Sequence, residues 1–133
     1  MLHDIRGPIE EAVELVEVQM RGTESRLVAQ LPRQPLLARA DPSHVKRVTL
    51  NLLRNAAQAG EHVWLHCEGV RGEVLVSVGD DGPGVPGHLA DRIFEPFVTD
   101  KEQGAGLGLA IVKRVVEANG GRIELGARDP ESG

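Results

Sequence analysis

The sequence predicts an α+β fold, a two-layer sandwich in which helices pack on one face of a mixed, mostly antiparallel sheet. The expected elements follow the order helix, two strands, helix, two strands, loop, helix, strand. That order lacks the regular alternation of strand and helix that builds a parallel sheet. The expected strands alternate apolar and polar residues, as strands with one buried face do. A chain of 133 residues is long enough for one hydrophobic core, so we expect a single domain over residues 1–133.

The composition excludes several classes of protein. Aromatic residues make up only 2% of the chain, so the core must be aliphatic. The net charge of -5 argues against nucleic acid as a partner. No apolar run approaches the roughly 18 residues of a membrane span, so we expect no membrane contact. Cys67 is the only cysteine, which excludes an internal disulfide and favours a reducing, cytoplasmic compartment.

The first part of the chain predicts a helix and two strands. Apolar residues recur at helical spacing over residues 8–20, and Pro8 suits the first helical position. The buried stripe of this helix is expected to contain Ile9, Ala12, Val13, Val16 and Met20. Residues 25–31 alternate as a strand, and residues 36–40 predict a short second strand.

A second helix is expected from Pro42 to about Ala59, between the capping residue Asp41 and a stop at Gly60. Its expected buried stripe consists of Val45, Val48, Leu52 and Ala56, with Leu53 beside it. Another face of the same helix carries Arg47, Asn51, Asn55 and Gln58. Asparagine is unfavourable inside a helix. This row is therefore either a solvated face or the polar wall of a site whose carboxamide oxygens can bind a hard cation such as Mg²⁺.

A β-hairpin with one buried face is expected from residues 61–68 and 73–78. His62 and His66 alternate with the apolar positions and should face solvent. Because Cys67 should point to the opposite face, a metal site made of these three residues is not favoured.

Two acidic residues, Asp80 and Asp81, follow the hairpin in a Gly/Pro-rich segment at residues 79–86. Such a segment is often a plain turn. Directly after a buried strand, it can also place a carboxylate at the floor of a pocket, where it accepts a hydrogen bond from an amino group.

A glycine-rich loop precedes the last helix. Gly104, Gly106 and Gly108 stand at every second position, and the apolar pattern of a helix runs from Leu109 to a stop at Asn119. The start of a helix offers unpaired N–H groups and the positive end of the helix dipole, which suits phosphate. The same loop taken alone can also be only a tight connection.

The residues on either side of this helix complete the expected fold. Residues 97–106 form a polar segment in which a mobile lid is expected, and Lys101 within it is a cation that can reach phosphate. Residues 121–127 predict a final strand. The candidate site residues thus converge from the second long helix, the acidic loop, the lid and the glycine-rich loop.

Four motifs, in this order, resemble those of the ATP-binding catalytic domain of sensor histidine kinases, within the wider group that includes gyrase and mismatch-repair ATPases. They are NLLRNAAQAG from Asn51, VGDDGPGVP from Val78, IFEPFVTDK from Ile93 and GAGLGLAIVKRVVEANGGRIEL from Gly104. Each motif alone is moderately specific, but four in order are very specific. The short lid at residues 99–103 is similar to that of nitrogen-regulation sensor kinases. The resemblance implies a Bergerat-type sandwich.

The resemblance also implies roles for individual residues. Asn55 would bind the Mg²⁺ that bridges the ATP phosphates, and Asn51 would line the phosphate site. Asp80 would accept a hydrogen bond from the adenine amino group, and Lys101 would contact the phosphates. The other implied nucleotide contacts are Gly82, Gly84, Phe94, Phe97, Gly104, Gly106, Leu107 and Gly108. The implied chemistry is transfer of the ATP γ-phosphate to a histidine, with Asn51, Asn55 and Lys101 as the catalytic residues.

Two positions depart from the pattern of the wider group. Gln58 stands where many members carry a lysine, so one phosphate contact is expected to be absent. Asn51 stands where the hydrolysing ATPases carry a glutamate that acts as general base toward water. Asparagine cannot take that proton at neutral pH, which favours a kinase over an ATPase.

The implied partners are a histidine phosphoacceptor and dimerisation domain of the same kinase and a downstream response regulator. Residues 3–8 loosely resemble the segment around a phosphoacceptor histidine, but too few residues separate His3 from Asn55 to hold a two-helix phosphoacceptor hairpin. We therefore expect a fragment that lacks the phosphoacceptor domain and the last strand of the sheet. Two alternatives stay open: a serine kinase of the anti-sigma-factor type, and a nucleotide-sensing module without transfer activity.

Overall fold

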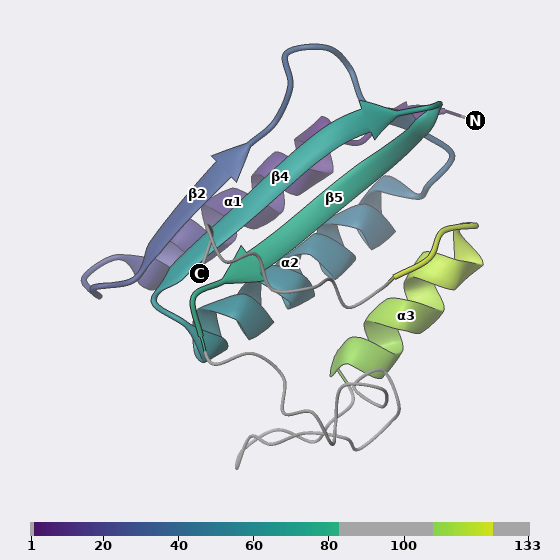
Figure 1. Ribbon diagram of the computed structural model, residues 1–133. Coiled ribbons are helices and arrows are strands. Elements are labelled where there is room, and N and C mark those ends of the chain that lie inside the picture. The colour runs from purple at the N-terminus through teal and green to yellow at the C-terminus, as the bar shows by residue number, and fades with distance from the viewer. Residues whose placement is uncertain (1, 83–107, 124–133) are drawn as a thin grey trace.

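The computed structural model describes residues 2–82 and 108–123, which form a layer of helices against a layer of strands (Figure 1). In chain order the elements are β1 (His3–Asp4), α1 (Arg6–Met20), β2 (Arg26–Gln30), β3 (Leu37–Ala38), α2 (Pro42–Ala59), β4 (His62–Val70), β5 (Glu73–Asp80) and α3 (Gly108–Ala118). The expected α+β sandwich is confirmed.

The main sheet has the strand order β2-β4-β5. β4 and β5 form the expected antiparallel hairpin, and β2 pairs with β4 in parallel, so the sheet is mixed. The hairpin turn consists of Arg71 (φ 53°) and Gly72 (φ 80°). Two consecutive residues with positive φ match the right-handed twist of the flanking strands, and this turn fixes the register that pairs Val63 with Asp80 at the far end of the hairpin.

The sequence pattern did not reveal β1, which pairs with β3 in a separate two-stranded sheet. Two side chains hold this small sheet in place. The Arg6 guanidinium donates to the Asp4 carboxylate at 2.8 Å, and the backbone N–H of Leu36 donates to the same carboxylate at 3.1 Å. The hydrogen bond from Arg6 holds the pKa of Asp4 well below its ordinary value. His3 lies in β1 and residues 6–8 lie in α1, so this segment is part of the described fold.

Helix α1 begins at Arg6, two residues before the expected start. The expectation that Pro8 takes the first helical position is therefore wrong. Pro8 is tolerated in the first turn because the N–H groups there have no partner within the helix. The expected buried stripe is confirmed, and its five residues are Ile9, Ala12, Val13, Val16 and Met20.

Helix α2 has the expected bounds, but its buried stripe differs from the expected one. Thr49, Leu53 and Ala56 are the buried residues, whereas Val45, Val48 and Leu52 are only half-buried. The Thr49 hydroxyl donates to the Val45 carbonyl at 2.8 Å, so its burial leaves no unpaired polar group. A polar residue thus occupies a core position that the apolar pattern assigned to its neighbour.

The core lies between the helices and one face of the sheet (Figure 1). β4 contributes Val63, Leu65 and Cys67, all at most 2% exposed, as the alternation predicted. Burial raises the pKa of the Cys67 thiol to about 11, so this cysteine acts as a small apolar residue. Among the described residues, no helix is both long and apolar enough to cross a membrane.

Three expectations fall wholly or largely on residues that the structure does not describe. The lid at 97–106 and the last strand beyond residue 123 lie outside the described residues, as does the segment 83–96. Residues 121–123 are described and belong to no helix or strand. The predicted helix after the glycine-rich loop is confirmed as α3, and Gly120 after it has φ 80°, as expected for a C-terminal stop.

Candidate functional site

The C-terminal end of α3 is tied to the beginning of α2. Asn119, directly after α3, accepts a hydrogen bond from the backbone N–H of Asp41 at 3.0 Å. Its Nδ2 donates to the Val115 carbonyl at 2.8 Å and lies 3.1 Å from Nδ1 of His44. Figure 1 shows α3 beside α2 and running in the opposite direction. At about 1.5 Å per residue, α3 extends back roughly 16 Å, so its first residue, Gly108, lies beside the C-terminal half of α2.

The C-terminal end of α2 and the end of β5 lie together at one end of the sandwich, and α3 begins farther back, beside the C-terminal half of α2 (Figure 1). Asp80 is the last residue of β5 and is half-buried. It follows Val76 and Val78 in the alternation, so it lies on the face of the sheet that the helices cover. Its Oδ1 accepts the backbone N–H of Gly82 at 2.8 Å. One carboxylate oxygen therefore fixes the turn, and the side chain is held at the junction of the two layers.

Gly82 packs against the last residue of α2. A Cβ on Gly82 would overlap the carbonyl oxygen of Ala59 and lie 2.7 Å from its carbonyl carbon. Any larger residue would push the turn after β5 away from α2. The structure thus gives Gly82 a packing role, in addition to the nucleotide contact that the resemblance implies.

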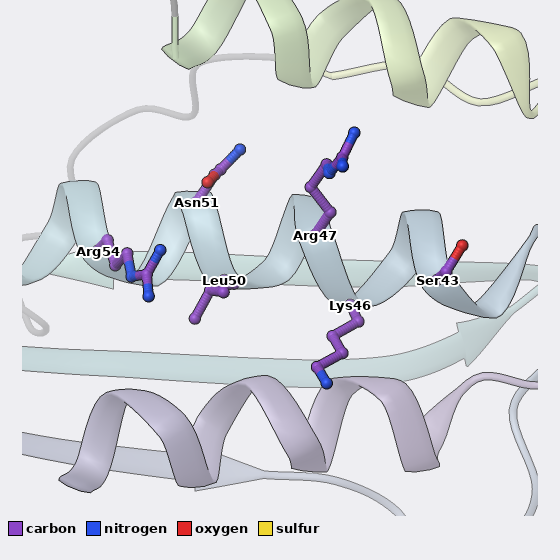
Figure 2. Close-up of a pocket in the computed structure, with 6 residues that line it drawn as sticks. All are labelled: Ser43, Lys46, Arg47, Leu50, Asn51 and Arg54. Carbon is purple, nitrogen blue, oxygen red and sulfur yellow. The ribbon is translucent and has the colours of Figure 1, made fainter. Parts of the chain in front are cut away.

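The polar row on α2 divides into two pairs. Asn51 and Asn55 are half-buried, whereas Arg47 and Gln58 are exposed. In Figure 2, the side chains of Asn51 and Arg47 point from α2 toward the α3 side of the molecule. The half-buried asparagines favour the polar-wall interpretation over a fully solvated face.

Asp81 is a site residue whose role the sequence did not indicate. Its Oδ1 accepts the backbone N–H groups of Glu61 at 2.8 Å and His62 at 3.0 Å, and its Oδ2 lies 2.7 Å from Nδ1 of His62. These contacts fasten the turn after β5 to the connection between α2 and β4. The hydrogen bonds from His62 lower the pKa of the Asp81 carboxyl. Asp81 thereby holds in place the turn that carries Asp80 and Gly82.

We expect Asp81→Ala to lower the melting temperature by several degrees and to weaken nucleotide binding, because the turn loses its attachment. Asp81→Asn keeps an acceptor for the two backbone N–H groups, so its melting temperature should fall less than that of Asp81→Ala. Since the folded state lowers the pKa of Asp81, its contribution to stability is complete above the ordinary carboxyl pKa and is lost as the pH falls through the lowered value. Thermal melts of both variants between pH 7 and pH 3 test this. Equal melting temperatures for Asp81→Ala and the wild type at pH 7 would contradict it.

Several predicted site residues lie outside the described residues. They are Gly84, Phe94, Phe97, Lys101, Gly104, Gly106 and Leu107. Gly108 is the first residue of α3. Within the described part of the chain, no group of three or more His, Cys, Asp or Glu side chains can hold a metal ion. His62 contacts Asp81, and Cys67 is buried on the opposite face, so the three-residue metal site stays unsupported.

The family described as Histidine kinase-, DNA gyrase B-, and HSP90-like ATPase matches residues 40–133, which is well over half of the chain. The chain belongs to this family. The match begins just before α2 and includes α2, β5 and α3. A family of ATPases implies that this domain binds ATP.

Individual relatives place the chain with the histidine kinases inside this family. The sensory histidine kinase/phosphatase NtrB of Escherichia coli O157:H7 is 36% identical over 130 residues, which cover 87% of this chain and 37% of NtrB. The solved catalytic domain of the histidine kinase ThkA is 32% identical with a TM-score of 0.79, over 90% of this chain and 80% of that structure. A structure of ThkA in complex with the response regulator protein TrrA matches with a TM-score of 0.75 and 29% identity, over 91% of this chain and 35% of that chain. The chain thus spans well under half the length of these curated relatives: 37% of NtrB, and 19% of the sporulation kinase D of Bacillus subtilis, which is 37% identical over 98 residues.

Proposed function

We propose that this domain transfers the γ-phosphate of ATP to a histidine on a separate, dimeric phosphoacceptor domain of the same kinase. Three features support the proposal: Asp80 at the end of β5 beside the end of α2, the half-buried pair Asn51 and Asn55 in the C-terminal half of α2, and the start of α3 beside that half. A carboxylate, two carboxamides and a helix start are the groups that an adenine, a metal-bound triphosphate and its phosphate oxygens require.

Asp80 is proposed to select adenine. Its Oδ1 already accepts the Gly82 N–H, and among the described residues its Oδ2 has no hydrogen-bond partner. A carboxylate whose direction is fixed by one of its oxygens suits the exocyclic amino group of adenine, because that group only donates and a carboxylate only accepts. Guanine presents a carbonyl oxygen at the corresponding position and would be repelled.

Asn55 is proposed to hold Mg²⁺ together with the ATP phosphates. Mg²⁺ commonly takes one or two protein oxygens and completes its octahedron with phosphate oxygens and water. Asn55 offers one half-buried carboxamide, and the described residues contain no cluster of acids or histidines that can hold a metal ion. This arrangement fits a site in which the ATP phosphates supply most of the ligands. When bound, the ion neutralises charge on the β- and γ-phosphates.

The remaining roles follow the same geometry. Asn51 lies one turn before Asn55 and is proposed to line the γ-phosphate. It orients the phosphate but cannot deprotonate water, so transfer to a protein side chain is favoured over hydrolysis. Lys101 is proposed to neutralise phosphate charge, and Phe94 and Phe97 to anchor the lid. The backbone around Gly84 and at Gly104, Gly106, Leu107 and Gly108 is proposed to contact the nucleotide.

The proposed partners extend beyond this chain. A response regulator would receive the phosphate from the histidine, which the ThkA–TrrA complex supports by similarity. A cytoplasmic location, where ATP is abundant and Cys67 stays reduced, belongs to the same proposal.

The proposal is tested by incubating the chain with radiolabelled ATP, Mg²⁺ and E. coli NtrB from which the region that matches this chain has been removed. We expect label on the NtrB fragment that is stable in base and lost in acid, as a phosphorus–nitrogen bond to histidine is. Acid-stable label would instead indicate a serine kinase. ATP binding without transfer to either kind of side chain would leave the nucleotide-sensing module as the correct function.

A further inference from the structure

A shallow groove of about 390 Å³ follows the outer side of α2 (Figure 2). The residues that line it are Ser43, Lys46, Arg47, Leu50, Asn51 and Arg54. We call this surface the α2 groove. From its first to its last lining residue it extends over three helical turns, or roughly 16 Å, which matches the contact length of one short helix.

The α2 groove carries positive charge that the described part of the chain leaves largely uncompensated. Arg47 and Arg54 are exposed, and neither forms an ion pair with another described residue. Lys46 lies 3.4 Å from Glu11, and the two side chains are 41% and 62% exposed, so solvent screens this ion pair and leaves it weak. The groove is thus a local basic surface on a chain whose net charge is -5.

The groove also reaches the proposed phosphate site. Asn51 belongs both to its lining and to the polar wall proposed for the γ-phosphate. Arg47 lies one turn before Asn51, and both side chains point to the same side of α2 (Figure 2). A phosphoryl group moves only between atoms held almost in contact, so the proposed role of Asn51 requires the segment that carries the acceptor histidine to lie beside this residue. The surface next to Asn51 along α2 is the α2 groove.

We propose that the α2 groove docks an acidic helical segment of the phosphoacceptor domain, next to the histidine that receives the phosphate. This inference rests on the proposed function. Carboxylates of the segment pair with Arg47 and Arg54, and an apolar side chain covers Leu50, which is half-buried at the middle of the groove. Nucleic acid is the weaker candidate for this surface, because the chain as a whole would repel it.

The test uses the double variant Arg47→Glu/Arg54→Glu with the NtrB fragment as phosphate acceptor. At saturating ATP, we expect the KM for the acceptor to rise about tenfold or more, while the Kd for ATP stays within about twofold of the wild type. The KM of the wild type should rise with added NaCl, because salt screens the attraction between the arginines and the acidic segment. The KM of the double variant should not rise, because the variant lacks this attraction. Arg26→Glu is the matched control, since Arg26 is an exposed arginine in β2, outside the α2 groove, and should leave both constants unchanged.

Each outcome separates the two proposals. Equal KM values for the double variant and the wild type would overturn the docking role of the α2 groove and leave the kinase proposal intact. A large loss of ATP affinity in the double variant would also overturn docking, because the arginines would then bind the nucleotide. No phosphorylation of the acceptor by the wild type would overturn the proposed function, and the docking role with it.

Discussion

Leu53→Ala is expected to lower the free energy of unfolding by about 2–5 kcal/mol, the range for truncating a fully buried leucine. Leu53 is 0% exposed and belongs to the core cluster that α1, α2 and β4 form. The substitution removes apolar contacts and leaves a cavity that the surrounding side chains fill only in part. Urea denaturation followed by circular dichroism measures the loss, with an unchanged slope showing that the two-state transition persists.

The control for this prediction is Leu75→Ala on the opposite face of β5. Leu75 is 49% exposed and makes no contribution to the core cluster, so its truncation should cost less than about 1 kcal/mol. A loss of stability for Leu53→Ala as small as that for Leu75→Ala would contradict the position of α2 as the central helix of the core.

Asp80→Asn is expected to weaken ATP binding by about 10- to 100-fold without changing stability appreciably, since a buried donor left unpaired costs about 1–3 kcal/mol. The Gly82 N–H keeps an oxygen of the side chain at the Oδ1 position. The amide nitrogen then takes the place of Oδ2 and faces the adenine amino group. Both groups are hydrogen-bond donors, so the hydrogen bond to adenine is lost. Calorimetric titration with ATP measures the change.

The matched control is Glu73→Gln at the opposite end of β5. Glu73 is exposed and pairs with Val70 next to the hairpin turn, far from the end of α2, so the same loss of one charge should leave ATP affinity unchanged. Equal affinities for Asp80→Asn and Glu73→Gln would remove Asp80 from the proposed adenine site.

The bounds of α2 were predictable because local signals define them. The Asp41 carboxylate accepts the Ser43 N–H at 2.9 Å, Pro42 begins the helix and Gly60 ends it. The buried face of α2 was not predictable, because Thr49 is polar. Its hydroxyl can be buried only because it forms a hydrogen bond that exists once the helix has folded. The apolar pattern therefore predicted the helix correctly but predicted part of its buried face wrongly.

The candidate site shows the same division between local and long-range information. Asp80, Asn51 and Asn55 could be named as candidates from the sequence, because each stands in a recognisable motif, and their roles stay predictions. Asp81 and Asn119 were not, since their partners are distant in the sequence: 19 positions separate Asp81 from His62, and 78 separate Asn119 from Asp41. β1 was missed for the same reason. Two residues carry no alternation, and the strand is held by contacts of Asp4 and Arg6 with residues near the end of β2 and beyond.

The most direct test of the nucleotide site is a calorimetric titration of the domain with ATP, once with Mg²⁺ and once with EDTA, for the wild type and Asn55→Ala. The wild type should bind more tightly with Mg²⁺. Asn55→Ala should still bind ATP in EDTA but lose the additional affinity that Mg²⁺ gives, about 10- to 100-fold for the loss of a residue that supports the metal. A wild type that binds no ATP, or an Asn55→Ala variant that keeps the full Mg²⁺ effect, would contradict the nucleotide site proposed on α2, β5 and α3.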